Sequence, residues 1–249
     1  RYFKKVMVAV LVFTGILPAT IQAEEGAVVN VHIDVEVATL DHNIATDGTS
    51  FEVIGSLIQG LMTLDPDGNA IPGIAESYEV SEDGTVFTFK LRDAVWSNDA
   101  PVTANDFVFS WQRLANPDTA SEYSFILEAA GVLNASEVAS GDKALEELGV
   151  KALDDKTLEV TLARPVAFFI DLLAFSPLYP LNEEFYNSVG DQYATAPDKI
   201  LSNGAFVLAS YEPAASAFEL KKNDKYYDAD NVHLGGLKHQ VIKDSQQAV

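Results

Sequence analysis

The chain has 249 residues, a formal net charge of −21 and no cysteine. The missing cysteine excludes disulfides, thiolate nucleophiles and cysteine zinc sites. The acidic balance argues against nucleic acid, whose phosphates are neutralised by Lys and Arg, and no basic stripe favours an anionic membrane surface. A 48% apolar composition is typical of a globular protein that buries a substantial core, as one large domain or two smaller ones.

The first 23 residues follow the three-part plan of a secretory signal peptide. Arg1, Lys4 and Lys5 form a positive start, residues 6–17 are an apolar run, and Ala23 is a small residue at a cleavage point. The alternative is a transmembrane anchor, but the run is shorter than the roughly 20 apolar residues that a spanning helix needs. We expect an exported protein, free in the periplasm, because no cysteine follows the leader to carry a lipid anchor.

The two ends of the sequence indicate whether it is complete. The chain begins with Arg1 rather than Met, and residues 244–249 trail off after a strand-like run at 238–242. We therefore expect that the sequence is cut short at both ends.

Periodicity predicts the first elements of the mature chain. Residues 28–33 are β-rich and typical of a strand, and residues 41–48 form a polar loop. Apolar residues that share one face predict a helix over 49–62, where Thr49 and Glu52 can form a capping box.

A hairpin is predicted next. Residues 81–84 read Ser-Glu-Asp-Gly, a turn in which Gly84 can take positive φ. The turn separates residues 78–80 from residues 86–91, whose apolar side chains alternate with a period of two. That period is typical of a half-buried strand.

A capped amphipathic helix follows the hairpin. Thr103 stands at the position of an N-cap with Asp106 three residues later, and apolar residues continue at helical spacing to Leu114. Trp96 and Trp111 occupy core-like positions in this region, so we expect both to be buried.

Beyond Pro117 the same rules predict shorter elements. Pro177 and Pro180 stiffen what we interpret as an extended crossing between domains. Strands and helices mixed in this order predict an α/β or α+β protein. The further elements are a strand over 157–162, helices over 167–174 and 183–189, and a second hairpin of 204–211 and 217–222.

One calcium-like spacing is present. Asp65, Asp67 and Asn69 stand at alternate positions with Glu76 at the twelfth place. The glycine that such a loop requires is Ala70, and no pair of helices flanks it, so a plain turn is favoured.

Motifs for catalysis are lacking. The histidines show no metalloprotease spacing, and the chain has no nucleophile elbow, phosphate loop or dinucleotide fingerprint. We expect the histidines to be structural or exposed, and we expect no metal or cofactor. Two acidic pairs could supply the carboxylates of a hydrolase, but solvated surface is favoured in an acidic protein. The residues concerned are His32, His42, His233 and His239, and the pairs Asp154-Asp155 and Glu183-Glu184.

A family resemblance adds to this interpretation. The chain contains the run GIAESYEVSEDGTVFTFKLRDAVWSNDAPVTANDFVFSWQRLANP over 73–117, followed in order by ASEYSFIL, LGVKALDDKTLEVTL, ILSNGAFVLASYEP and LKKNDKYYDADNVHL. The set resembles the extracytoplasmic solute-binding proteins of ABC importers, specifically the oligopeptide- and dipeptide-binding proteins of family 5. The resemblance covers nearly all of the chain after the leader. Each motif alone is weak, and their joint order is specific.

The resemblance implies a fold. It is the two-lobed α/β periplasmic binding protein of class II, or Venus-flytrap, type, present here as an N-terminal fragment without the C-terminal lobe. Residues 24–60 and 183–249 would belong to the first large lobe, and residues 61–182 would form the smaller lobe of peptide-binding members.

The resemblance also implies ligand contacts. In relatives, the tyrosine of the motif that matches Ala120-Ser121-Glu122-Tyr123 reaches the peptide from the smaller lobe. By its physics alone, Tyr123 would be a core aromatic residue. Thr46, Asp47 and Gly48 match a region that runs beside the peptide backbone, although the motif is poorly kept and an ordinary turn with a helix cap is the alternative.

The implied function is capture of oligopeptides in the periplasm and delivery to an ABC permease in the inner membrane. The protein would act as a monomer, without enzymatic activity and without binding nucleic acid. The C-terminal lobe of relatives carries the acidic residue that pairs with the peptide amino terminus, so these residues alone should not bind peptide tightly. The alternatives are a receptor of the same fold for dipeptides, murein peptides, nickel chelates or sugars, or a secreted hydrolase.

Overall fold

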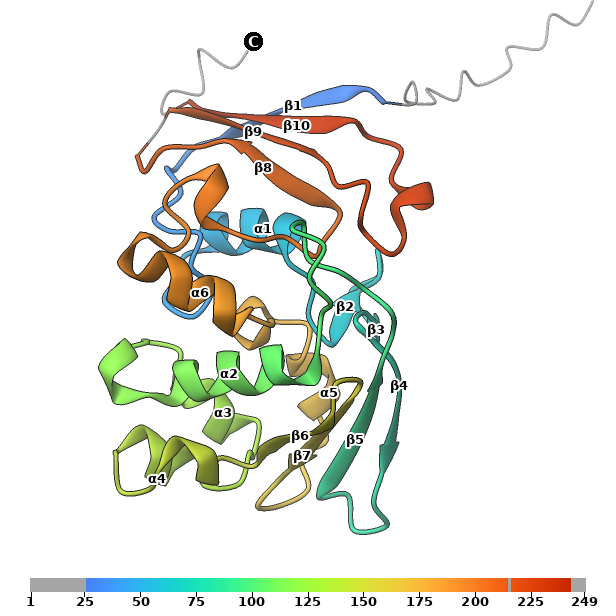
Figure 1. Cartoon of the computed structure of the whole chain (residues 1–249), viewed down its shortest axis with the longest axis vertical. Helices are drawn as coiled ribbons and strands as arrows, with labels where there is room; N and C mark the ends of the chain where they lie inside the picture. The colour runs from blue at the N-terminus through green and yellow to red at the C-terminus, as the bar shows by residue number, and fades with distance from the viewer. Residues whose placement is uncertain (1–25, 215, 243–249) are drawn as a thin grey trace, which may run out of the picture.

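The computed structural model describes residues 26–214 and 216–242 (Figure 1). The expected signal peptide and the expected cut at residues 244–249 lie outside these described residues. Among the described helices, none combines the length and the apolar character that crossing a bilayer requires.

The two ends of the described chain meet in one four-stranded sheet at the top of Figure 1. β1 pairs in parallel with β10, and the remaining pairs are antiparallel. The predicted first strand, the second hairpin and the late strand are thereby confirmed. In spatial order the strands are β1 (Val28–Ile33), β10 (Gly236–Val241), β9 (Ala217–Lys222) and β8 (Phe206–Ser210).

A second four-stranded sheet, antiparallel throughout, lies at the lower right of Figure 1. It contains the predicted hairpin, whose turn includes Gly84 at φ +71°. A small separate hairpin, which the sequence did not predict, precedes it. The strands of the second sheet in spatial order are β4 (Ala75–Val80), β5 (Val86–Leu91), β7 (Thr157–Thr161) and β6 (Val150–Asp154), and the small hairpin is β2 (Met62–Leu64) with β3 (Ala70–Pro72).

Helices fill the space between and beside the sheets (Figure 1). The predicted capped helix is α2, with Thr103 as N-cap, and the Thr103 N–H donates to Asp106 Oδ2 at 2.9 Å. α6 matches its predicted range, whereas α5 is shorter than the predicted 167–174. The helices are α1 (Gly48–Leu57), α2 (Ala104–Ala115), α3 (Phe125–Ala129), α4 (Ala135–Ala139), α5 (Phe169–Leu172) and α6 (Glu183–Val189).

Two expectations about connections are wrong. The helix predicted over 49–62 ends at Leu57, and Ile58 is extended with φ −126° and ψ 138°. The next backbone N–H, of Gln59, donates to Asn203 Oδ1 at 2.9 Å. Beyond the end of the helix, a residue distant in sequence is therefore the acceptor. The stretch around Pro177 is not an extended crossing, because Ser176–Leu178 forms a buried 3₁₀ turn.

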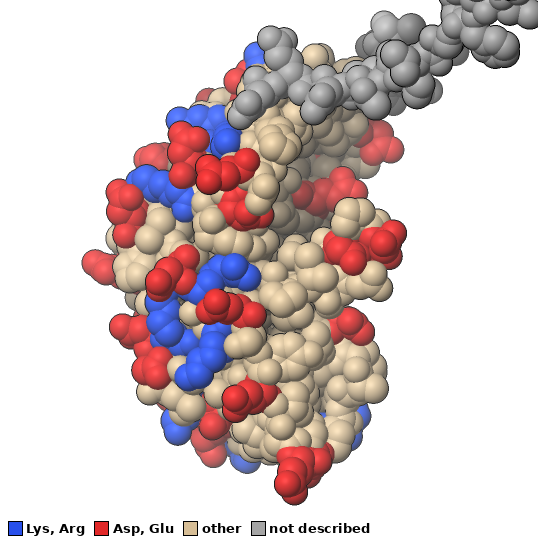
Figure 2. Space-filling view, turned by 90° about the vertical axis from the view of Figure 1, so that its right-hand side faces the viewer, with Lys and Arg blue, Asp and Glu red and all other residues tan. Residues whose placement is uncertain are grey.

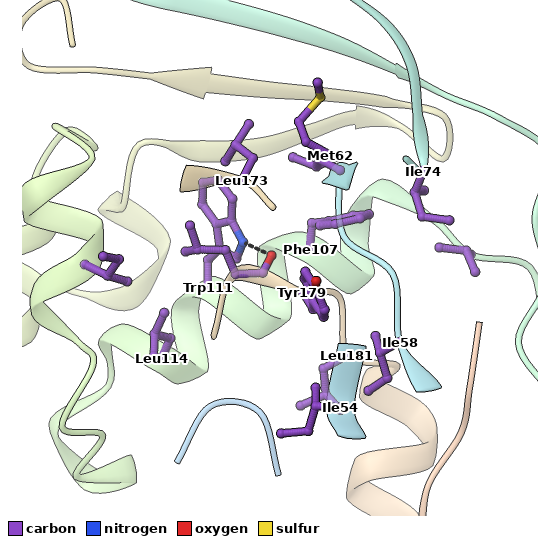
Figure 3. Packing of buried hydrophobic residues seen from close by; sticks show 14 of the residues in the cluster. Ile54, Ile58, Met62, Ile74, Phe107, Trp111, Leu114, Leu173, Tyr179 and Leu181 are labelled. Carbon is purple, nitrogen blue, oxygen red and sulfur yellow. Dashed lines mark hydrogen bonds between the residues drawn. The ribbon is translucent and has the colours of Figure 1, made fainter. Parts of the chain in front are cut away.

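One hydrophobic core joins the helices to both large sheets. Figure 3 shows α2 at its centre, with residues of α1, of the start of β2 and of the 173–181 segment around it. Trp96 and Trp111 are 1% and 0% exposed, as predicted. The Trp111 indole N–H donates to the Leu178 carbonyl at 2.9 Å, so its polar atom is satisfied inside the core (Figure 3).

The cap of α1 also differs from expectation. Thr49 and Glu52 do not form the capping box, because the N-cap is Asp47. One carboxylate oxygen of Asp47 accepts the Ser50 N–H at 2.8 Å, and the other accepts the Ser50 hydroxyl at 2.6 Å. Asp47 therefore satisfies a backbone donor that the first turn would otherwise leave unpaired.

Substitution Asp47→Ala removes both of these hydrogen bonds. We expect a loss of about 1 kcal/mol in the free energy of unfolding, the usual cost of deleting an acidic N-cap. Equilibrium urea denaturation measures it. The control is Glu52→Ala on the same helix, which should change stability by less than about 0.5 kcal/mol. A loss in Glu52→Ala with none in Asp47→Ala would favour the capping box instead.

Candidate ligand-binding site

Tyr123 lies in a cluster of aromatic rings. Its ring centroid is 5.5 Å from that of Phe51, 5.3 Å from that of Phe175 and 5.6 Å from that of Phe125. Tyr123 is half-buried, and Phe125 is 55% exposed. Among the described residues, none forms a hydrogen bond with the phenol oxygen of Tyr123, a group that can both donate and accept.

The same cluster connects Tyr123 to the start of α1. Phe51 belongs to the first turn of α1, directly after the predicted loop residues Thr46, Asp47 and Gly48. Thr46 and Gly48 are exposed, while Asp47 is occupied with capping the helix. The structure thus places Tyr123 against the helix that the loop begins. Phe51 and Phe175, which the sequence did not single out, make this connection.

A buried ion pair holds the preceding part of this loop. The Arg113 guanidinium binds Asp41 with two hydrogen bonds, of 2.8 and 2.6 Å, and also donates to Asn43 Oδ1 at 2.9 Å. The two charged side chains are only 12% and 7% exposed. The guanidinium also lies 4.6 Å from the ring centroid of Tyr186 on α6. Two hydrogen bonds in one plane fix orientation as well as distance, so the pair attaches the loop to α2.

Ser110 extends the network to the segment before α6. Its hydroxyl donates to the Tyr179 carbonyl at 2.6 Å and lies 3.1 Å from His42 Nε2 and 3.2 Å from Asn43 Nδ2. Because the hydroxyl proton is used on the carbonyl, Ser110 accepts from both side chains. Asn43 also donates to the Pro177 carbonyl at 3.2 Å. Residues 41–43, α2 and residues 177–179 are therefore held in one arrangement.

Two buried groups in this region have shifted pKa values. Burial lowers the pKa of His42 to about 4 from 6.5, and within the described residues its Nδ1 has no hydrogen-bond partner. A proton there would place a second charge beside Arg113 with nothing to accept it. Burial raises the pKa of Asp106 to about 6, although its carboxylate accepts the Trp96 indole N–H at 3.0 Å. His42 is thus structural and buried, one of the two expected alternatives.

Within the part of the chain that the structure describes, the calcium-like loop does not form a metal site. Asp65 Oδ1 accepts the N–H groups of Asp67 and Asn69 at 2.9 and 2.8 Å, which is a local turn. Among the residues that the structure describes, no group of three or more His, Asp or Glu side chains could hold a metal ion.

Comparison with protein families now adds to this geometry. The model of the bacterial extracellular solute-binding proteins, family 5 (middle region), matches residues 69–249. Two relatives are the dipeptide-binding protein of Lactococcus lactis, 38% identical over 86% of this chain, and the periplasmic oligopeptide-binding protein OppA of Salmonella typhimurium, 38% identical over 88%. The chain spans 39% and 42% of the lengths of these two relatives.

Solved structures match in the same way. OppA of Listeria monocytogenes bound to peptide superposes with a TM-score of 0.87 at 40% identity, over 91% of this chain and 44% of that one. The substrate-binding domain of an oligopeptide ABC transporter from Bacillus anthracis gives a TM-score of 0.86 at 44% identity, over 90% and 43%. The fold is therefore that of the OppA-type two-lobed binding proteins, of which this chain spans less than half.

These matches in sequence and in fold show the family of the chain. The chain belongs to the bacterial extracellular solute-binding protein family 5. The predicted family and fold class are confirmed.

Breaking the buried ion pair tests the network. Arg113→Met leaves the Asp41 carboxylate buried without its partner, and we expect a loss of about 3–5 kcal/mol in the free energy of unfolding. The control is Lys238→Met at the half-exposed Lys238–Glu219 pair, 3.3 Å apart, which should cost at most about 1 kcal/mol. Urea denaturation of both variants decides. Equal losses would mean that the buried pair does not hold the loop.

His42 predicts a pH dependence. The unfolded imidazole binds a proton near pH 6.5 and the folded one only near 4, so the unfolded state binds more protons between these values. The contribution is fully present above pH 6.5 and is lost as the pH falls towards 4. The difference between the two pKa values corresponds to about 3 kcal/mol in the free energy of unfolding.

The measurement is the difference in unfolding free energy between wild type and His42→Gln across this pH range. Asp106, whose pKa is raised, works in the opposite direction, but it is present in both proteins and cancels in the difference. His32→Gln serves as the control. A difference that does not change with pH would contradict the assignment.

Proposed function

We propose that this chain is part of the solute-binding component of an ABC importer that captures oligopeptides and delivers them to a permease in the inner membrane. The observation that carries the proposal is the half-exposed Tyr123, whose hydroxyl has no partner in the described structure, on a fold that matches a peptide-bound OppA with a TM-score of 0.87. A core tyrosine would be buried and hydrogen-bonded instead.

The chemistry of recognition follows from the groups present. The Tyr123 hydroxyl can donate to a peptide carbonyl or accept from a peptide N–H, and its ring offers an apolar surface. Thr46 and Gly48 are exposed at the start of the helix that carries Phe51, and they would supply backbone groups to an extended ligand. Contacts with the peptide main chain would give affinity without reading side chains, and hydrated pockets would accept varied side chains.

The proposal includes a division into lobes. Residues 61–182 would form the smaller lobe, and residues 24–60 and 183–249 part of the first large lobe. The remainder of the binding surface would come from polypeptide of the length that relatives have beyond this match. Ligand contacts made only in the closed form would shift the hinge equilibrium towards closure, and the permease would recognise that form.

The remaining parts of the proposal concern context. The protein would be exported by its leader, remain free in the periplasm and act as a monomer without enzymatic turnover, cofactor or nucleic acid. A second ligand class is favoured by one finding, since a relative from Escherichia coli, 36% identical over 83% of this chain, is a probable deoxycholate-binding periplasmic protein. A panel of ligands must therefore include non-peptides.

Isothermal titration of the protein expressed from its complete gene tests the proposal. We expect saturable binding of mixed short peptides, and a loss of about tenfold in affinity for Tyr123→Phe, the equivalent of one hydrogen bond of about 1.4 kcal/mol. Tyr78→Phe is the matched control, because Tyr78 is a 39% exposed tyrosine on β4.

Binding of a bile acid, sugar or nickel chelate in place of peptides would contradict the proposed ligand class, but it would still agree with a solute receptor. Equal affinities of the Tyr123 and Tyr78 variants for peptide would remove Tyr123 from the site. Steady product release from a peptide or ester substrate would contradict the proposal that the protein is a receptor without enzymatic turnover.

A further inference from the structure

Cations from three distant parts of the sequence gather on one side of this acidic protein. The sequence has 16 Lys and Arg against 37 Asp and Glu, and it shows no basic stripe. Figure 2 shows Lys and Arg side chains as a band down the left part of the face that it views, with acidic side chains among them. Two adjacent hollows of the surface contain or adjoin Arg92, Lys156, Lys221, Lys222 and Lys225.

The first hollow, of about 360 Å³, is lined by apolar residues, by cations and by one carboxylate. The apolar residues are Ala94, Val95 and Pro101, the cations are Lys156 and Lys225, and the carboxylate is Asp93. The ring of Tyr227 also lines it, with the guanidinium of Arg92 4.1 Å from the ring centroid. This combination fits an apolar side chain flanked by negative charges.

The cations of this hollow are already ordered. Lys156 Nζ donates to the carbonyls of Arg92 and Val102, both at 3.2 Å, and Lys225 Nζ donates to the Ser97 carbonyl at 2.9 Å. Their rotamers are thus restricted before any partner arrives, which lowers the entropy cost of binding.

The second hollow, of about 340 Å³, continues from the first and shares Lys225 with it. Its lining includes the apolar residues Val207 and Leu208, the cations Lys221 and Lys222, and one carboxylate, Asp224. Within the described residues these two lysines have no ion pair. The two hollows form one surface, named here the basic groove, whose lining repeats apolar residues beside cations.

The four lysines that line the basic groove outnumber the three carboxylates in or beside it, which are Asp93, Asp99 and Asp224. Lys225 pairs with Asp99 at 2.7 Å and Lys156 with Asp93 at 3.6 Å, but the two carboxylates are 77% and 105% exposed. Pairs this exposed are weak and can exchange for a partner's carboxylates. The net negative charge of the rest of the molecule is screened beyond about 8 Å at physiological salt, so the nearest cations govern a contact here.

We propose that the basic groove is a docking surface for an acidic, extended segment of a partner protein, one that alternates carboxylates with small apolar side chains. The apolar side chains would enter the two hollows, and the carboxylates would meet Lys225 between them and the lysines beyond. Two hollows lined in part by apolar residues favour such a segment over a flat anionic bilayer. The groove shares no residue with the candidate ligand site around Tyr123.

The test uses the protein from its complete gene and a fluorescein-labelled peptide of repeated Glu-Val-Asp-Ala, blocked at both ends. Fluorescence anisotropy should show saturable binding that weakens as NaCl rises from about 50 to about 300 mM. The double variant Lys221→Gln/Lys222→Gln and the single variant Lys225→Gln should each weaken it, by roughly tenfold for the double variant. The charge-matched control Lys143→Gln/Lys151→Gln should not change it.

Competition separates this site from the ligand site. An excess of unlabelled short neutral peptide should leave the acidic probe bound, and the groove variants should bind that neutral peptide like the wild type. Displacement by the neutral peptide would place the probe in the ligand site and overturn the proposal. So would equal binding by the groove variants and the control, absence of saturable binding, or stronger binding of phosphatidylglycerol vesicles through the same lysines. If the neutral peptide does not bind at all, the proposed function fails, while the groove variants still decide this proposal.

Discussion

The bidentate pair between Arg113 and Asp41 is the interaction on which the arrangement of the candidate site depends. It lies where residues 41–43, the C-terminal turn of α2 and the Tyr186 ring on α6 converge. A buried pair of this kind adds little net stability over an apolar substitute, but it permits few alternative geometries. Its effect is specificity of position, because the loop that leads into α1 can occupy one place only.

The aromatic cluster uses that fixed position. Because the loop is held, the first turn of α1 presents Phe51 to Tyr123, and Phe175 closes the cluster from a third part of the chain. A tyrosine held by ring contacts alone keeps its hydroxyl available, unlike Tyr179, whose hydroxyl donates to the Ala174 carbonyl at 3.0 Å. This contrast between two tyrosines of one core separates a side chain available for a ligand from one that completes the fold.

Charge is distributed unevenly over the surface of this protein. The acidic surface as a whole keeps a protein in solution and apart from its copies. Against that background, the four lysines that line one groove form a local exception with a defined shape. The candidate site around Tyr123, by contrast, presents aromatic rings and a hydroxyl without charge.

Local interactions explain what the sequence alone determined. The β4–β5 hairpin and helix α2 were predicted because turn, alternation and cap are contacts within a few residues. The order of the motifs also indicated the family and the fold class. The choice of Tyr123 depended on resemblance, since an aromatic residue just past a helix end would by itself favour a core role.

Only the tertiary structure decided the rest, because the deciding contacts join distant residues. α1 ends at Leu57, and shortly after it the Gln59 N–H donates to the side chain of Asn203, which is far along the chain. Buried His42 lies within hydrogen-bond distance of the Ser110 hydroxyl. Because Ser110 is far from His42 in the sequence, no local pattern predicts this contact. The basic groove exists because the fold brings residues 92, 156 and 221–225 together, which a linear search for a basic stripe cannot detect.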